Sequence, residues 1–274
     1  MELKSTCYNV DAFGVATVML SRPERRNAWT GRMHAEYRWC CSQANVDTSV
    51  RVIVVQGDPQ GRAFCVGADA TALSGHVERG GYDDGLRGEQ ANPGYGVHPF
   101  LDAHFAWQLG LRVPIIANVN GACAGVALAL AAFCDIRFAA AEAVLATASP
   151  KLGLPAEYGL SWMLPRIMSR TVATDLLFSG RRFTGAEAAD YGFALKAPSL
   201  DRIDAEVKHY AHVLATEVSP ASLTMTKRQL ARDLLRHDVG TSIREADELL
   251  SNAMTQPDFT EGVVALREKR PPRF

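Results

Sequence analysis

The 274-residue sequence lacks the features by which nucleic-acid-binding, membrane-spanning and secreted proteins are usually recognised. Its charges nearly balance, with 29 Lys and Arg against 30 Asp and Glu, so composition gives no indication of nucleic acid binding. No apolar run free of breaking residues reaches the ~20 residues of a membrane helix. The opening stretch, MELKSTCYNVDAFGV, lacks the charged-then-apolar pattern of a secretory signal. We therefore expect a cytoplasmic protein with no membrane or nucleic acid partner.

Cysteine is present, but not in a pattern that indicates metal binding or disulfide bonding. The 6 cysteines include no C-x-x-C pair, and the 7 histidines are scattered away from them. Neither GxGxxG nor GxxxxGK[ST] occurs, so no motif indicates nucleotide binding. The cysteines are predicted to be buried thiols: Cys7, Cys40, Cys41, Cys65, Cys123 and Cys134.

The sequence does contain an alternation of strand and helix signals, followed by helical signals alone. Apolar runs rich in β-branched residues predict strands at 12–20, 50–57, 114–120, 135–140 and 143–147. Helical patterns and a capping box predict helices at 30–47, 125–134, 160–168, 172–178 and 184–192. Later helices are predicted at 201–218, 220–237, 243–254 and 259–267. This order predicts an α/β core over 1–198 and a helical subdomain over 199–274, with a mobile glycine-rich surface segment at 74–99.

Two glycine turns, each placed after an apolar strand, could carry chemistry. The first is GRAFCVGAD at 61–69, and the second is NGACAG at 120–125, which runs straight into a predicted helix. Glycine has no Cβ, so the backbone can approach a ligand closely, and the N–H groups at a helix start point outward. Two such groups converging on one point would form an oxyanion hole, a site for a negatively charged oxygen. Glycine at strand ends also makes ordinary turns, so that simpler role stays open.

The stretch SPKLGLPAEYG, 149–159, contains a single acid, Glu157, among largely apolar residues. A carboxyl group in apolar surroundings resists ionisation, which suits a group that takes up a proton and returns it. Two simpler roles are also open. Glu157 could cap a helix that begins near Gly159 and interact with its dipole, or it could be a solvated surface acid.

Five separated motifs resemble those of the enoyl-CoA hydratase/isomerase (crotonase) superfamily, in the same order and over nearly the whole chain. They are SRPERRNA, GRAFCVGAD, NGACAGVALALAAFCDIRFAA, GLPAEYGLSWMLPRI and LLFSGRRFTGAEAADYGF. The resemblance implies a spiral of repeated ββα units and a C-terminal helical part that packs in trimers or in a dimer of trimers and helps to cover the CoA. It implies an acyl-CoA substrate, no metal, and no cofactor other than the coenzyme A that is part of the substrate. By position, the two N–H groups that hold the thioester oxygen would belong to Ala68 and Val126, the latter just after Gly125.

The chain departs from the resemblance at the two glutamates that handle water in hydratases. Their positions are occupied by Ala129 and Ser149 here. Ser149 could hold a water or the substrate by a hydrogen bond, but neither residue can act as a carboxylate base. In relatives that shift double bonds, or that attack with a carboxylate, an acid sits at the place that matches Glu157.

The remaining candidates follow from their place in these motifs. Arg25, Arg26 and Ala28 lie in the segment that resembles the CoA-contacting stretch, where arginines could bind phosphate. Asp69 is expected to fix the first turn by hydrogen bonds next to the substrate. Weaker candidates are histidines near the acyl pocket, cysteines beside the turns that more simply fill space, and C-terminal cations for the CoA phosphates: His76, His98, His104, Cys65, Cys123, Lys227 and 267–270.

The sequence thus predicts an enzyme that holds an acyl-CoA thioester oxygen and transfers a proton with Glu157. Two alternatives are an acyl-CoA hydrolase or C–C lyase of the same family, in which the carboxylate attacks carbon, and an acyl-CoA-binding protein without catalysis. We expect only weak hydration of an enoyl-CoA.

Overall fold

The computed structural model describes residues 1–71, 74 and 97–274, and in them the strands form two sheets. The larger sheet has the order β1 (Thr6–Val10), β2 (Val15–Leu20), β3 (Val52–Gly57), β5 (Ile115–Val119), β7 (Ile136–Ala139). The smaller sheet has the order β4 (Ala63–Cys65), β6 (Ala122–Ala124), β8 (Val144–Ala146), β9 (Phe183–Thr184). The outer pairs, β1 with β2 and β8 with β9, are antiparallel, and the other strand pairs are parallel.

Successive strand pairs divide themselves between the two sheets. The strands β3, β5 and β7 join the larger sheet, and the strand that follows each one, β4, β6 or β8, joins the smaller sheet. Parallel neighbours require a crossover between them, so each such pair advances the chain by one turn of a spiral. The expected α/β spiral of repeated strand pairs is therefore confirmed.

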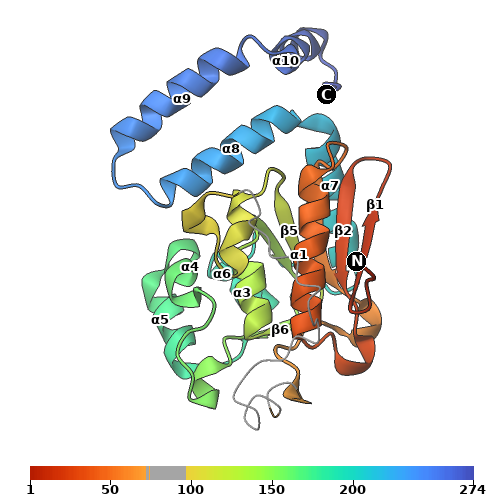
Figure 1. Ribbon diagram of the computed structural model, residues 1–274, viewed down its shortest axis with the longest axis vertical. Helices are drawn as coiled ribbons and strands as arrows, with labels where there is room; N and C mark the ends of the chain where they lie inside the picture. Colours follow the sequence, from red (N-terminus) through yellow and green to blue (C-terminus); the bar gives the residue numbers. More distant parts are fainter. Residues whose placement is uncertain (72–73, 75–96) are drawn as a thin grey trace.

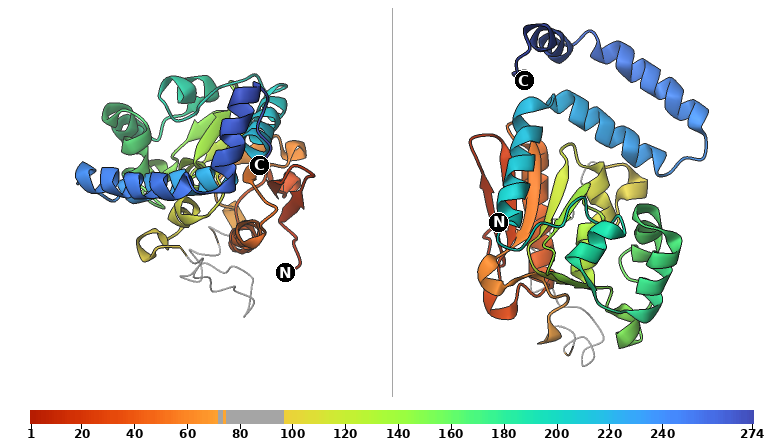
Figure 2. Two further views of the ribbon diagram at one scale, coloured as in Figure 1. Left: turned by 90° about the horizontal axis from the view of Figure 1, so that it is seen from above. Right: turned by 180° about the vertical axis from the view of Figure 1, so that it is seen from behind.

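Helices on both faces bury the larger sheet. Helix α1 (Gly31–Val46) begins at its N-cap Thr30, whose side chain accepts a hydrogen bond from the Met33 N–H. It contacts β1 and β2 on one face, and α7 (Ile203–Glu217) contacts β2, β3, β5 and β7 on the other (Figures 1 and 2). Helix α3 (Val126–Ala132) is buried along its whole length, as its alanines and leucines predicted.

Further helices cover the smaller sheet and extend from one end of the body. Their bounds are α4 (Leu160–Ile167), α5 (Arg170–Ser179), α6 (Gly185–Asp190), α8 (Pro220–Asp233), α9 (Val239–Ala253) and α10 (Pro257–Glu268). Helix α8 crosses the end of the body, and α9 and α10 lie beyond it (Figure 1). No residue of α9 is buried, although the helix carries the exposed apolar side chains of Val239, Ile243 and Leu250, and the exposed Met254 follows as its C-cap. The division of the chain after residue 198 stays a prediction, since α7 packs against the sheet.

The structure corrects several predictions. The segment 61–69, expected to be a loop, contains β4, and β1, β6 and β9 were not predicted. Strands β4 and β6 have three residues each, too few to show periodicity, so tertiary pairing determines them. Cys7, expected to be buried, is exposed on β1, while the other five cysteines are buried. Most of the glycine-rich segment 74–99, with His76, lies outside the described residues.

The described residues contain neither a membrane-spanning helix nor a cluster of metal-binding side chains. None of the described helices is both long and apolar enough to cross a bilayer. The described His, Cys, Asp and Glu side chains form no group of three or more that could hold a metal ion.

Candidate active site

The two glycine turns lie side by side at the carboxyl ends of neighbouring parallel strands. Strand β4 pairs with β6, so the turn after Cys65 and the turn after Ala124 leave the small sheet at the same edge. Gly67 has φ of 100°, and a Cβ added to it would lie 3.1 Å from the Ala124 carbonyl oxygen. A side chain is therefore disfavoured here both by the backbone conformation and by the contact between the turns.

The Ala68 amide points away from the neighbouring chain. Trp29 forms a parallel bridge with Ala68: its N–H donates to the Gly67 carbonyl at 2.8 Å, and its carbonyl accepts from the Asp69 N–H at 2.9 Å. In such a bridge the amide of the middle residue projects to the opposite side. Among the described residues, none accepts a hydrogen bond from the Ala68 N–H.

The Val126 amide is the corresponding donor of the second turn. Gly125 has φ of 54° and is the N-cap of α3, and its own N–H donates to the Ala146 carbonyl at 3.0 Å. The Gly125 carbonyl accepts from the amides of Leu128 and Ala129. Val126, as the first helical residue, has an N–H with no intrahelical acceptor. The left-handed conformation falls on the glycine, so a valine at the next position is compatible with the turn.

A third strand end brings a carboxyl group beside these turns. Strand β8 pairs with β6, and the chain after it passes Gly125, whose added Cβ would lie 3.8 Å from the Ala148 Cβ. Ser149 is 1% exposed, and its hydroxyl donates to Glu157 Oε2 at 3.0 Å. The half-buried Glu157 is therefore tied to the end of β8, next to the second turn.

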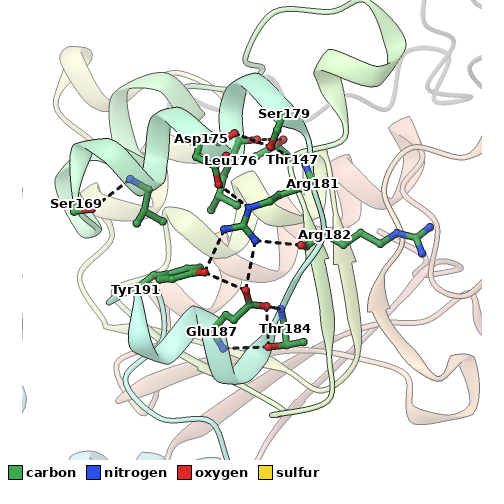
Figure 3. Close-up of polar contacts among 11 residues, drawn as sticks. Thr147, Ser169, Asp175, Leu176, Ser179, Arg181, Arg182, Thr184, Glu187 and Tyr191 are labelled. Carbon is green, nitrogen blue, oxygen red and sulfur yellow. Dashed lines mark hydrogen bonds and ion pairs between the residues drawn. The ribbon is translucent and has the colours of Figure 1, made fainter.

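Hydrogen bonds behind β8 hold this strand end in place (Figure 3). The Thr147 hydroxyl donates to the Leu176 carbonyl on α5 at 2.9 Å. Arg181, after α5, donates to Asp175 at 2.6 Å and to Glu187 of α6 at 3.4 Å. The predicted capping box at the start of α6 is confirmed. The Thr184 side chain accepts a hydrogen bond from the Glu187 N–H, and the Glu187 carboxylate accepts one from the Thr184 N–H.

The capping role considered for Glu157 does not match its contacts. The N-cap of α4 is Gly159, with φ of 79°, and no side chain caps this helix. Tyr158, between the two, also has a positive φ, of 50°. These two residues reverse the direction of the chain. The Glu157 carboxylate accepts a hydrogen bond from the Ser149 hydroxyl and not from the backbone amides of α4.

Asp69 holds the first turn through contacts on both sides. Its Oδ1 accepts from the Thr71 N–H at 2.9 Å, which fits the expected turn-fixing role. Its Oδ2 accepts from Arg22 at 2.9 Å, and the same Arg22 nitrogen donates to the Ala28 carbonyl at 2.8 Å. Arg22 was not predicted as a site residue, although it lies in the same SRPERRNA segment as Arg25 and Arg26. Its pairing with Asp69 joins this segment to the turn.

The CoA-contacting candidates lie on that same segment. Arg25 and Arg26 are exposed, and neither makes an ion pair with a described residue. Ala28 is buried at 6% exposure, one residue before the bridge to Ala68. The buried Asn27 side chain donates to backbone carbonyls on both sides of η2 (Pro59–Gly61) and so fixes the segment beside β4. Two exposed guanidinium groups thus lie near the first turn.

Several other candidates have structural partners instead. Lys227 is 6% exposed, and its ammonium group donates to Asp135 at 2.7 Å and to the Val113 carbonyl at 2.8 Å, so its expected role at the CoA phosphates is wrong. Arg270 forms an ion pair with Glu261 at 2.7 Å. The buried thiols of Cys65 and Cys123 have pKa values raised by desolvation, to about 12 for Cys65, and this fits space filling.

The candidate histidines His98 and His104, both exposed, lie in different surroundings. His98, before η3 (Pro99–Leu101), lines a groove of about 650 Å³ together with residues of α8 and with Asn45 near the end of α1. His104, before η4 (Phe105–Gly110), lies with its ring centroid 5.2 Å from the ring of Tyr158. Of these two histidines, His104 is thus close to the Glu157 segment.

The chain is similar to known proteins over nearly its whole length. The family described as Enoyl-CoA hydratase/isomerase matches residues 11–274. The chain is 30% identical over 261 residues to the 1,2-epoxyphenylacetyl-CoA isomerase of Escherichia coli, covering 95% of each chain. It is 30% identical to the mouse enoyl-CoA hydratase domain-containing protein 2, mitochondrial, covering 95% of this chain and 84% of that protein. A solved structure of a probable enoyl-CoA hydratase/isomerase from Mycobacterium abscessus superposes with a TM-score of 0.84 at 29% identity, covering 98% of each chain.

Proposed function

The chain belongs to the enoyl-CoA hydratase/isomerase family, and from this we propose that it binds an acyl-CoA thioester at the adjoining ends of β4, β6 and β8 and shifts a double bond by proton transfer through Glu157. The observation that carries the proposal is the short contact between Ser149 and Glu157, which ties a carboxyl group to the strand end beside the second turn.

The amides of Ala68 and Val126 hold the thioester oxygen. Both belong to turns at one edge of the small sheet, and no residue in the described part of the chain accepts a hydrogen bond from either amide. When a proton leaves the carbon next to the carbonyl, negative charge develops on this oxygen, and preorganised N–H groups stabilise it. Removal of one such donor in other enzymes raises the barrier by about 3–4 kcal/mol.

Glu157 moves the proton. Its carboxylate removes a proton from one carbon of the acyl group, and that C–H electron pair forms an enolate whose charge lies on the oxygen held by the amides. The carboxylic acid then returns the proton to the carbon two positions away, and the double bond moves accordingly. The transfer is balanced without a water, a metal or a redox partner. Ser149 donates to one carboxylate oxygen and so orients the group.

The residues at the two hydratase positions support isomerisation over water addition. Ala129 is fully buried in α3 and has no titratable group, and Ser149 is a hydroxyl that already donates to Glu157. Water addition needs a base for the nucleophile and an acid for the carbon, and one carboxyl group does not supply both at once.

The surroundings support two further parts of the proposal. The exposed Arg25 and Arg26 would bind phosphate groups of coenzyme A, for which guanidinium is well suited. Self-association through the C-terminal helices, as trimers or paired trimers, is supported by the exposed apolar side chains of α9 and α10.

The variant Glu157→Gln tests the proposal against a panel of enoyl-CoA double-bond isomers. A positioned acid or base contributes about 10²–10⁴ in rate, so kcat should fall by that factor while the thioesters still bind. Glu217→Gln, at an exposed position on α7, is the matched control and should retain full turnover. Retained turnover in Glu157→Gln would remove this residue from the mechanism.

Two further readouts separate the alternatives. Mass spectrometric capture of an acyl group on Glu157 would favour hydrolysis or C–C cleavage, because these use the carboxylate as a nucleophile. Tight binding of acyl-CoA by calorimetry, with no product from any substrate, would indicate a binding protein. Hydration of crotonyl-CoA should be weak, and a rate typical of efficient hydratases would contradict the assignment.

A further inference from the structure

A cluster of aromatic and imidazole rings connects the first turn to Glu157. Five side chains form it: Trp29, His34, His104, Phe105 and Tyr158. We call this cluster the ring wall. Its neighbouring ring centroids lie 5.2–6.1 Å apart, and the contacts are edge-to-face or tilted. These separations are those of favourable ring pairs.

The ring wall begins and ends at the residues to which the proposed function assigns chemistry. At one end, Trp29 forms the backbone bridge with Ala68. At the other end, Tyr158 directly follows Glu157 in the chain. Because the Ala68 amide projects away from Trp29, the Tyr158 end of the wall is the end nearer to the substrate. A thioester whose reacting carbon lies at the Glu157 carboxylate would have Tyr158 and His104 beside it.

The ring wall has a buried layer and an accessible layer. Trp29 is 4% exposed and Phe105 is fully buried, so these two rings form the support. His34 and Tyr158 are half-buried and His104 is exposed, so these rings are accessible to a ligand. Burial, with the nearby Glu157 carboxylate as a second cause, raises the pKa of Tyr158, which keeps the phenol neutral at ordinary pH.

The backbone holds Tyr158 in an unfavourable conformation to place its ring here. A φ of 50° is uncommon for a bulky residue, and the next residue, Gly159, has φ of 79°. A Cβ at Gly159 would lie 3.0 Å from the Phe133 ring, so the reversal is tight. The same two residues direct the Glu157 carboxylate to Ser149 and the Tyr158 ring to His104.

We propose that the acyl group of the substrate is aromatic and that His104 and Tyr158 determine this preference by ring contacts, an inference that rests on the proposed function. An aromatic ring offers a negative face and a positive edge, and both can pair with the imidazole and phenol rings of the wall. A saturated group of the same size offers only its apolar surface. His104 and Tyr158 are specificity residues here, and proton transfer stays with Glu157.

Two thioesters of nearly equal size isolate the effect of aromaticity. Dissociation constants for phenylacetyl-CoA and cyclohexylacetyl-CoA, measured by calorimetry on the full chain, should differ by about 5-fold or more in favour of the aromatic group. One ring pair corresponds to about a 2- to 12-fold preference. In His104→Leu and in Tyr158→Asn the preference should fall by such a factor. Asparagine tolerates a positive φ and so keeps the reversal that places Glu157.

His98→Leu is the matched control. His98 and His104 are both exposed residues that immediately precede a 3-10 helix. His98, however, lines the groove together with Asn45 of α1. Asn45 is 11 residues, or about 16 Å of helix, from His34 of the ring wall, so His98 lies away from the wall. This variant should retain the wild-type preference. A structural effect of the wall variants would weaken both thioesters equally and leave their ratio unchanged, and that result would overturn the proposal.

Butanoyl-CoA separates the failure of this inference from the failure of the proposed function. If the wild-type protein binds butanoyl-CoA and does not distinguish the two larger thioesters, the acyl-CoA function stands and the aromatic preference is refuted. If it binds none of the three thioesters, the proposed function is refuted, and the inference with it.

Discussion

The substitution Lys227→Met probes the buried ion pair that joins the C-terminal helices to the body. Lys227 lies on α8 and donates to Asp135 and to the Val113 carbonyl, at 2.7 Å and 2.8 Å. Asp135, just before β7, also accepts from the Ile115 N–H of β5 at 2.7 Å. Methionine keeps most of the aliphatic packing and removes the charge and both hydrogen bonds.

The structure gives the size of the effect. Breaking a buried ion pair by removing one partner costs about 3–5 kcal/mol, because the other charge stays behind without compensation. Asp135 keeps its backbone donor and is 22% exposed, so water can approach it and the lower end of this range applies. We expect a loss of about 3 kcal/mol in the free energy of unfolding. For a chain of this size that corresponds to roughly 6–12 °C in Tm.

Urea denaturation and thermal melting at one fixed protein concentration measure the change. Lys208→Met, at an exposed position on α7, is the control and should stay within about 0.5 kcal/mol of wild type. The double variant with Asp135→Asn should lose less than the sum of the two single variants, because the unpaired charge is gone. A Lys227→Met protein as stable as the control would refute the reasoning that this pair anchors α8.

Three further outcomes follow from the structure. Gly185→Ala places a Cβ 1.9 Å from a backbone carbonyl oxygen, so urea denaturation should show a loss of about 3 kcal/mol in the free energy of unfolding. Gly262→Ala places a Cβ with no atom within 4 Å, so it should stabilise α10 by up to about 1 kcal/mol. Thiol titration of the native protein at pH 8 should find one fast group per chain, since only Cys7 is exposed and burial raises the pKa of the other five thiols; two or more fast groups would contradict this. A hydrogen bond from Arg270 is the main cause that lowers the pKa of Glu261 to about 2. The stabilisation by this contact is therefore fully present at pH values above the unfolded-state pKa of about 4.3 and is lost as the pH falls toward 2. An NMR titration of Arg270→Ala should find the pKa of Glu261 raised toward about 4.3.

Much of the fold could be predicted because its signals are local. The helix at 30–47 was predicted from apolar spacing, and the structure gives it the N-cap Thr30 and a buried face that includes Met33 and Tyr37. The capping box at Thr184 likewise depends on residues within one turn of helix. Strands β4 and β6 were missed because three residues show no period, and they exist only through pairing with each other.

The candidate site was predicted in part for the same reason. The two glycine turns can be read along the chain, and the family resemblance assigned the donor amides to Ala68 and Val126, while the common edge of the turns depends on the pairing of β4 with β6. The contact between Ser149 and Glu157 joins residues eight apart, across a segment whose course no periodic pattern reveals. Arg22 was missed because its partner, Asp69, is 47 residues away.

The sequence by itself determined the residue types available for chemistry: a lone acid in a largely apolar stretch, two glycine turns after apolar strands, and no carboxylate at positions 129 and 149. Only the tertiary structure brought rings from three separate segments together as the ring wall. Only the tertiary structure showed that Lys227 forms a buried ion pair with Asp135 and is therefore not a ligand-binding residue. Secondary structure depends on interactions over a few residues, which the chain order states directly. Contacts between distant segments depend on how whole helices and strands pack. The order of residues along the chain does not state how far apart two such segments lie in space.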